Sequence, residues 1–311
     1  MKHLIVLNAI SLTARPDIIN QEMVEEAFKG LDYTVYVTEA PRSAVKYVDE
    51  FLTKNANDQV RVYACGGDGT IHEVANALVD HDNAELAVYA CGTGNDFVKT
   101  YGGENKFRDF KALIEGNASP IDISKIEGGK LQNPWYSINV INFGFDAIVG
   151  AMGNYYKENG YSEKAKAKGL SPYDYALKND AMKYGRFNDT VVTADGEELN
   201  KKQILLCTLA QGKYVGGKFL CAPKSDNTDG LIDVCLLKTM TFLGLGLIIG
   251  TYTAGKHLDK PRKKIAYRRA KVINIDAPKD IDVCVDGEMI KGKNFTVTCM
   301  KDAIKLVLPR E

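Results

Sequence analysis

Two glycine-rich segments have the residue types and the spacing to bind phosphate groups. GGDGT occupies positions 66–70 and GTGND positions 92–96, and each follows a short apolar run and precedes helix-forming residues. Glycine lets the backbone take a positive φ and approach a ligand closely, because it carries no Cβ. A helix that starts behind such a turn presents free N–H groups and the positive end of its dipole. We therefore expect both turns to accept an anion such as a triphosphate.

Asp68 adds a requirement to the first of these turns. A carboxylate beside phosphates is repulsive unless a cation lies between them, so its presence favours Mg²⁺ or a metal-bound water at this place. On the residues alone, GGDG can also be a tight turn with an Asx-type cap. Neither turn matches the pattern GxxxxGK[ST], and no lysine follows the glycines, which excludes a P-loop nucleotide hydrolase.

Alternating strand and helix patterns must position these turns. Strands are predicted at 4–7, 33–37, 60–65 and 86–91, and helices at 16–28, 44–52, 71–79 and 96–101. This alternation is typical of a parallel sheet, in which consecutive strand-to-helix turns lie at the same carboxyl edge. The two glycine-rich turns can therefore line one cleft.

The rest of the chain is rich in β signals. Strands are predicted at 135–142, 190–193, 203–209, 231–237, 272–275, 281–285, 295–299 and 303–308, and helices at 147–158, 172–184 and 242–256. Short strands with polar turns such as ADG at 194–196 indicate an antiparallel sandwich. A chain of 311 residues is comfortable as two domains, so we expect an α/β domain over 1–125 and a β-sandwich domain over 126–311.

The order of the motifs resembles that of the lipid kinases that share the diacylglycerol kinase catalytic domain, including bacterial diacylglycerol kinases and sphingosine kinases. The two glycine-rich turns carry the resemblance together with IHEVAN at 71–76, NFGFDA at 142–147, GG at 216–217, AP at 222–223, TDGL at 228–231 and DGE at 286–288. It implies a two-domain architecture like that of NAD kinases and diacylglycerol kinases: an N-terminal Rossmann-like parallel α/β domain and a C-terminal β-rich sandwich. It also implies that the chain end, from about 300 to 311, packs back on the first domain.

The resemblance further implies the roles of particular residues. Glu288 would accept the proton of the acceptor hydroxyl, with Asp286 beside it, and Asp68 would organise the metal of an ATP–Mg²⁺ complex. A structural Mg²⁺ would be held by Asp226, Asp229 and the carbonyl group of Leu231. The nucleotide contacts would fall on Thr38, Gly66, Gly67, Asp68, Gly69, Thr70, Ile71, His72, Thr93, Asn95 and Asp96.

Phosphoryl transfer mainly requires positioning and charge stabilisation, which two such turns and Mg²⁺ can supply. A glutamate such as Glu288 can orient and deprotonate an alcohol. From the residues alone, Glu288 can also be a hairpin residue, and His72 a surface residue of its helix.

A lipid acceptor is indicated by an apolar segment at 242–250 with cations at 256–264 and 268–271 directly after it. Such a pair of features can rest on an anionic membrane surface, although a core helix followed by a solvated loop explains it as well. The apolar stretch at 242–255 is shorter than the ~20 residues that span a bilayer. We expect peripheral membrane contact, with diacylglycerol as the first candidate acceptor and other long-chain alcohols next.

The composition bears on the partners of the protein and on its cellular compartment. Forty basic residues balance forty acidic ones, so no nucleic-acid partner is expected. The seven cysteines lack disulfide or zinc spacing and are typical of reduced thiols in a cytoplasmic protein. A homodimer is left open. Two alternatives remain: a kinase of another small molecule, like the NAD kinases that share GGDG, and a non-catalytic lipid- or nucleotide-binding protein.

Overall fold

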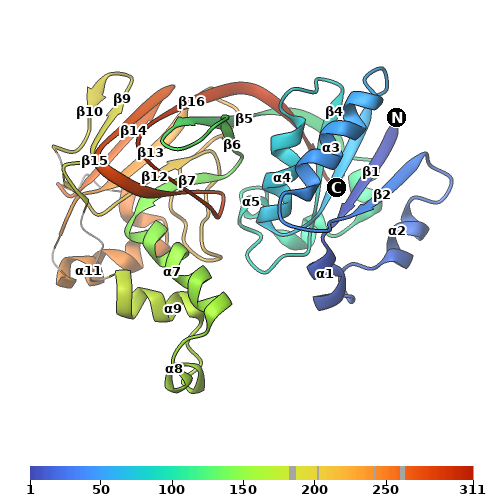
Figure 1. Ribbon diagram of the computed structural model, residues 1–311. Helices are drawn as coiled ribbons and strands as arrows, with labels where there is room; N and C mark the ends of the chain where they lie inside the picture. Colours follow the sequence, from blue (N-terminus) through green and yellow to red (C-terminus); the bar gives the residue numbers. More distant parts are fainter. Residues whose placement is uncertain (182–186, 202, 241, 260–262, 311) are drawn as a thin grey trace.

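The computed structural model describes residues 1–181, 187–201, 203–240, 242–259 and 263–310, which form two domains joined by long strands (Figure 1). The last residues of the helix predicted over 172–184 and positions 260–262 of the predicted basic cluster lie outside the described residues. The fold class expected from the sequence is confirmed: a parallel α/β domain is followed by a β-rich sandwich domain.

The first domain is built on four parallel strands in the order β2-β1-β3-β4. Every residue of the strand that leads to the first glycine-rich turn is buried, as expected for a parallel strand covered on both faces. The strands are β1 (Lys2–Leu7), β2 (Tyr33–Val37), β3 (Val60–Gly66) and β4 (Ala84–Ala90).

Helices cover the two faces of this sheet. They are α1 (Ala9–Ala14), α2 (Gln21–Ala27), α3 (Ser43–Lys54), α4 (Asp68–Leu78), α5 (Asp96–Lys99), the 3₁₀ turn η1 (Glu104–Phe107) and α6 (Phe110–Ile114). The helix predicted from Pro16 starts only at Gln21, because the side chain of Asn20 caps it by accepting a 2.9 Å hydrogen bond from the Met23 amide. The sequence did not predict α1, which Asn8 caps in the same way.

The remaining strands belong to the second domain, except that β5 and β16 also extend into the first. They are β5 (Asn117–Gly128), β6 (Trp135–Ser137), β7 (Val140–Gly144), β8 (Phe187–Asn188), β9 (Val191–Ala194), β10 (Glu197–Glu198), β11 (Gln203–Ile204), β12 (Leu206–Ala210), β13 (Ile232–Leu237), β14 (Ile265–Ala270), β15 (Val272–Val285) and β16 (Glu288–Leu308). The order β14-β13-β12-β7-β15-β16 is antiparallel throughout. The second domain has two buried hydrophobic cores: one is formed by residues of the strands, and the other also includes helical residues such as Phe145, Ile248 and Tyr252.

The helices of the second domain project from one side of the molecule, downward in Figure 1. They are α7 (Phe145–Asn159), α8 (Glu163–Ala167), α9 (Pro172–Ala176), the π-helical turn η2 (Leu177–Ala181), α11 (Phe242–Thr253) and the 3₁₀ turn η3 (Lys256–Leu258). Among the described residues, no helix combines the length and the apolar character needed to cross a bilayer.

Two pairs of predicted strands are single long strands. The predicted strands at 272–275 and 281–285 both belong to β15, and those at 295–299 and 303–308 both belong to β16. Irregularities in pairing explain the apparent breaks, between Asp276 and Ile281 in one strand and between Met300 and Ile304 in the other. The strand predicted over 135–142 is instead split into β6 and β7.

The end of β16 lies in the first domain. Leu306 pairs with Leu86 of β4, and from Phe295 to Leu308 the strand also pairs with β5. Ile304, Leu306 and Val307 belong to the buried core of the first domain. The last strand therefore completes the sheet that carries the glycine-rich turns.

Because β16 crosses into the first domain, shortening two nearby leucine side chains should lower the free energy of unfolding by unequal amounts. Leu306 is 1% exposed and Leu308 is 38% exposed. Leu306→Ala should lower the free energy of unfolding by about 2–5 kcal/mol, because it removes buried methyl groups and leaves a cavity. Leu308→Ala should cost less than half as much. Urea titration of both variants measures the difference, and equal costs would contradict this placement of the chain end.

Candidate active site

The two glycine-rich turns touch each other through their backbones. A Cβ on Gly92 would overlap the Cα of Gly67, and a Cβ on Gly94 would approach the Asp68 carboxylate to 2.9 Å. Side chains are therefore excluded where the turns meet, which explains the glycines at these positions. Gly67 is the N-cap of α4, so the first amide groups of that helix lie at this junction.

The second turn is held from within and from the first domain's own N-terminal segment. The buried Asn95 has a φ of 50°, accepts a hydrogen bond from the Gly92 amide (3.0 Å) and donates one to the Gly92 carbonyl (2.9 Å). Arg15 also donates to the Gly92 carbonyl group, at 2.8 Å. Asn95 thus fixes the shape of the turn, whereas Thr93 is exposed beside it.

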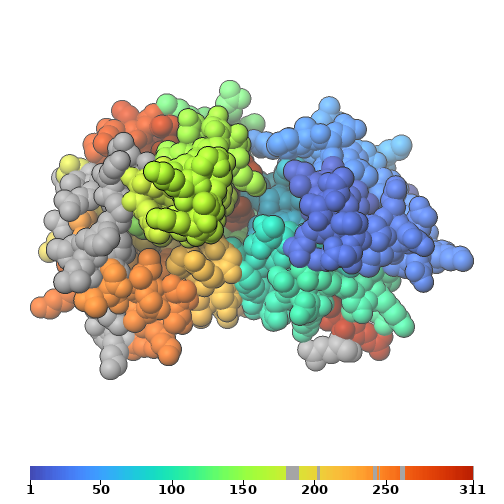
Figure 2. Space-filling model, turned by 90° about the horizontal axis from the view of Figure 1, so that it is seen from below, coloured from blue at the N-terminus to red at the C-terminus, as the bar shows by residue number. Residues whose placement is uncertain are grey.

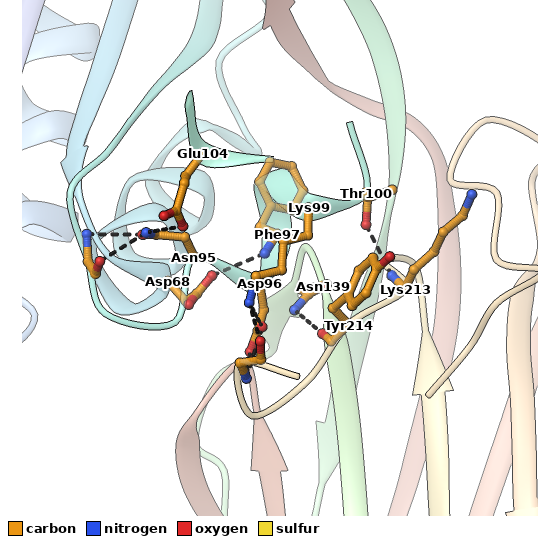
Figure 3. A network of polar contacts seen from close by, with 12 residues as sticks. Asp68, Asn95, Asp96, Phe97, Lys99, Thr100, Glu104, Asn139, Lys213 and Tyr214 are labelled. Atoms are coloured by element: carbon orange, nitrogen blue, oxygen red, sulfur yellow. Dashed lines mark hydrogen bonds and ion pairs between the residues drawn. The ribbon is translucent and has the colours of Figure 1, made fainter. Parts of the chain in front are cut away.

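Asp68 and Asp96 lie together where the turns meet (Figure 3). Asp68 accepts a hydrogen bond from the Phe97 amide at 3.1 Å. Asp96 accepts hydrogen bonds from Lys99 and, across the domain boundary, from the Gly217 amide, each at 3.0 Å. Burial raises the pKa of Asp68, and the negative charge of Asp96 raises it further. Lys99 already forms an ion pair with Asp96, so Asp68 is the carboxylate whose charge a nucleotide-bound Mg²⁺ would mainly compensate.

The other residues predicted to contact a nucleotide differ in their surroundings: some are buried, some are exposed and some bond to neighbouring elements. Thr38 accepts a hydrogen bond from the Ala9 amide at 3.2 Å and joins the end of β2 to α1. The Ile71 side chain is fully buried, and its amide donates to the Gly67 carbonyl, so this residue is turned into the core. The Thr70 hydroxyl lies directly behind Gly66, and Gly69 is exposed.

The DGE segment forms a tight hairpin turn between β15 and β16. Asp286 and Gly287 have φ values of 49° and 101°, and Val285 pairs with Glu288 on the two sides. Two successive positive φ angles define a type I′ turn, for which Asp-Gly is a preferred sequence. The turn leaves Glu288 exposed and buries the Asp286 carboxylate.

The Asp286 carboxylate organises the segment that separates β6 from β7. It accepts hydrogen bonds from the Ser137 hydroxyl and from three successive backbone amides, those of residues 138–140, at 2.7–3.1 Å. A fifth bond, 3.1 Å long, comes from Nδ1 of His72 on α4. Burial alone would raise the pKa of Asp286, but the contacts with His72 and Ser137 outweigh it and keep this pKa below its usual value. A carboxylate held in this way is a weak base, so Asp286 is better suited to positioning than to proton transfer.

Sequence reasoning did not assign roles to Glu73 and Asn76 of the IHEVAN motif. Glu73 accepts hydrogen bonds from the amides of Arg42 and Ala44 and so caps the N-terminus of α3. Asn76 donates to the Tyr136 carbonyl (2.8 Å) and accepts from the Tyr136 amide (3.0 Å), which joins α4 to β6 of the other domain. Glu73 and Asn76 are three residues apart on α4, and this spacing is the sequence signal from which their roles could have been inferred.

The predicted structural metal site has competing partners. Asp229 accepts a hydrogen bond from the Leu231 amide and forms an ion pair with Arg269, while Asp226 accepts from the amide and hydroxyl of Thr228. Among the described residues, no cluster of three or more His, Cys, Asp or Glu side chains is arranged to hold a metal ion. A guanidinium group already neutralises Asp229, so this segment fits a cation poorly, and the structural Mg²⁺ stays a prediction.

Asp146, at the start of α7, is a buried acid that the sequence did not single out. One carboxylate oxygen accepts a hydrogen bond from the Ala147 amide, and the other has no hydrogen-bond partner. Burial raises the pKa of Asp146 to about 6. Asp146 follows β7, whose Asn142 pairs with Cys284 of β15, the strand that leads into the DGE turn.

The raised pKa makes a prediction about stability. Because the folded-state pKa of Asp146 lies above the unfolded value of 3.8, ionising this group costs folding energy as pH rises from about 4 to about 6. Asp146→Asn should therefore stabilise the protein by about 3 kcal/mol at pH 8 and by about half as much at pH 5. Denaturant titrations at both pH values measure this, with Asp17→Asn as an exposed control. A gain independent of pH would contradict the assignment.

Comparison with known proteins places these features in a family. Residues 2–126 match the model of the diacylglycerol kinase catalytic domain, and residues 139–308 match that of the YegS C-terminal NAD kinase beta sandwich-like domain. A protein of Shewanella frigidimarina, named as a YegS-like lipid kinase, is 28% identical over 94% of this chain and 89% of its own length. A diacylglycerol kinase of Staphylococcus aureus is 26% identical over 89% of this chain and 83% of its own.

A solved structure shows the same fold. The crystal structure of a diacylglycerol kinase from Bacillus anthracis matches with a TM-score of 0.66 and 22% identity, over 99% of this chain and 96% of that one. The family models together extend over both domains, and the motifs predicted to carry the resemblance lie within them. The chain therefore belongs to the family of lipid kinases that join a diacylglycerol kinase catalytic domain to a YegS-type β-sandwich domain.

Proposed function

We propose that this protein transfers the γ-phosphoryl group of ATP to a hydroxyl group of a lipid, with diacylglycerol or a related long-chain alcohol as the acceptor. The main support is the meeting of three segments at the domain boundary. The two glycine-rich turns are in backbone contact, and His72, one helical turn after Asp68, is bonded to Asp286 of the DGE turn. Figure 2 shows a hollow between the two domains on this side of the molecule.

The first domain would bind the nucleotide. The N-terminus of α4 offers amide groups and a positive dipole end to the phosphates, and glycine at 66, 67 and 69 lets them approach the backbone. Asp68 and Asp96 would hold Mg²⁺ through its oxygen-preferring coordination shell. When bound, this ion supplies charge neutralisation for the transferred group. Asp96 is in turn oriented by the Gly217 amide of the second domain, so the geometry of the nucleotide site would depend on both domains.

The second domain would present the base. Glu288 is an exposed carboxylate at the start of β16, and the buried Asp286 fixes the turn before it. In this arrangement Glu288 would accept the proton of the acceptor hydroxyl as the oxygen attacks the γ-phosphorus, while the bond from the γ-phosphorus to the bridging oxygen breaks and ADP leaves. Asp286 contributes by holding the turn in place.

The direct test is a screen of the purified protein with radiolabelled ATP, Mg²⁺ and extracted membrane lipids, with and without chelator. We expect a labelled phospholipid that disappears when metal is removed. Labelling of NAD without any lipid product would favour the NAD-kinase alternative. Nucleotide binding without turnover of any lipid would favour a non-catalytic binding protein.

Substitution of the proposed base gives a sharper prediction. Glu288→Gln keeps the shape of the side chain and removes its ability to take a proton, so kcat should fall by about 100-fold or more. Asp68→Asn should also reduce turnover strongly and raise the Mg²⁺ concentration needed. Glu50→Gln, on the exposed face of α3, serves as the control and should retain full activity. Near wild-type rates in Glu288→Gln would show that the base is another residue.

We also propose that the side of the molecule seen in Figure 2 rests on an anionic membrane. Exposed apolar side chains lie on three separate helices of this side: Ile10 on α1 is 75% exposed, Tyr155 on α7 is 54% exposed and Leu247 on α11 is 74% exposed. In Figure 2, α7 and the first domain with α1 lie on either side of the hollow, and α11 lies on the same face further from the first domain. A lipid could therefore enter the hollow from a bilayer that contacts this face.

The charges on this side support the same orientation. Lys157, Lys164 and Lys168, at the end of α7 and around α8, are exposed. By contrast, Arg268 and Arg269 of the predicted basic cluster form ion pairs with Glu197 and Asp229 and are less available to lipid. Each free cation near an anionic surface contributes about 1 kcal/mol. A cytoplasmic enzyme with peripheral membrane contact agrees with its free thiols and its proposed donor, ATP.

Membrane docking predicts that acidic substitutions on these helices weaken vesicle binding. The double variant Ile10→Asp, Leu247→Asp should bind phosphatidylglycerol vesicles at least about tenfold more weakly in a flotation assay, because two apolar contacts are lost and two negative charges gained. Leu31→Asp is the matched control, because Leu31 precedes β2 and so lies at the opposite, amino edge of the parallel sheet. Equal binding by both variants would count against docking through this side.

A further inference from the structure

His72 lies between the two halves of the proposed active site. It follows Asp68 by four residues on α4, so both side chains lie on the same face of that helix. Its side chain is buried, and Nδ1 lies 3.1 Å from Oδ2 of Asp286. The sequence predicted that His72 contacts the nucleotide, whereas the structure turns the imidazole toward the other domain.

The neighbouring groups determine which ring nitrogen carries the proton. A carboxylate such as Asp286 only accepts hydrogen bonds, so Nδ1 of His72 must donate. The side-chain amide of Asn76 is 3.4 Å from Nδ1, but its two hydrogens are directed to the carbonyl groups of His72 and Tyr136, at 2.8 Å each. Nδ1 therefore carries a hydrogen and donates it in the hydrogen bond to Asp286.

The contact ends at the turn that carries Glu288. Asp286 fixes this turn through its bonds to residues 137–140, and Glu288 follows after a single glycine. The His72 bond connects this assembly to the helix whose N-terminus would bind the phosphates. The position of the base relative to the nucleotide thus depends on this bond together with the Asn76–Tyr136 bonds, which join α4 to the residue before Ser137.

We infer that His72 is a positioning residue, which fixes the DGE turn against α4 through Asp286 and does not bind the nucleotide. This inference rests on the proposed function, because it assigns His72 a role in aligning Glu288 with the bound donor. A displacement of about 1 Å between reacting groups can cost about 100-fold in rate. Loss of the bond should therefore reduce turnover and leave nucleotide affinity intact.

Three substitutions separate positioning from nucleotide binding. In His72→Asn, the amide nitrogen is attached to Cγ as Nδ1 is, so it can donate to Asp286 from the same place. In His72→Gln the donor lies one bond further out, and His72→Leu has none. We expect His72→Leu to lower kcat by about 100-fold with the KM for ATP unchanged, His72→Gln to remain impaired, and His72→Asn to recover to within about threefold of wild type.

A second measurement does not depend on catalysis. Hydrogen–deuterium exchange of the peptides over 134–140 and 284–290 should be faster in His72→Leu than in His72→Asn, because, among the described residues, the Asp286 assembly keeps only the Asn76–Tyr136 bonds as polar contacts with α4. Equilibrium binding of an ATP analogue should be equal in both variants. If no lipid is phosphorylated by the wild type, the proposed function fails while the exchange data still test the bond.

Three results would overturn the inference. One is weaker nucleotide binding in His72→Leu, which would make His72 a ligand of ATP. Another is wild-type kcat in that variant. The third is equal loss in His72→Asn and His72→Leu with unchanged exchange in the DGE turn. Thermal unfolding of each variant establishes that the chain is folded before the rates are compared.

Discussion

The pairing of β5 with β16 is the constraint on which the rest of the structure depends. These antiparallel strands run from the first domain, where Leu308 faces Asn117, to the second, where Phe295 faces Gly128. Main-chain hydrogen bonds along both strands hold the two domains at a defined separation. The glycine-rich turns and the DGE turn belong to different domains, so their distance is set by this shared ribbon. The irregularity between Met300 and Ile304 marks the crossing between them.

Buried polar contacts refine the arrangement that the ribbon permits. Asp286, Asn76 and Asp96 each bond to backbone groups or side chains of the opposite domain. A buried polar group costs free energy unless it is paired, so these contacts favour the observed placement of the domains. Their contribution is therefore to select a unique geometry, whereas the apolar cores supply most of the stability.

The proposed active site is electrostatically unfavourable in the absence of ligands. The contact of the two turns brings Asp68 beside Asp96, and burial together with the Asp96 charge raises the pKa of Asp68, whereas Asp96 itself is bonded to Lys99 and to the Gly217 amide. Burial likewise disfavours the charge of Asp146. Local costs of this kind are common at functional sites, where a ligand or a cation offsets them. The stability of the surrounding β-sheets makes such a site tolerable.

The sequence alone determined the parallel α/β domain, the β-rich domain and the two glycine-rich turns, because these follow from local periodicity and from the special freedom of glycine. It could not show that residues 135–142 form two strands, with the Asp286 carboxylate bound to the backbone amides between them, or that His72 faces the other domain. The bond between His72 and Asp286 joins residues 214 positions apart. Such contacts depend on how β16 returns to the first domain, and no pattern within a few residues encodes that path. Tertiary packing alone therefore decided which acid is buried and which is left exposed.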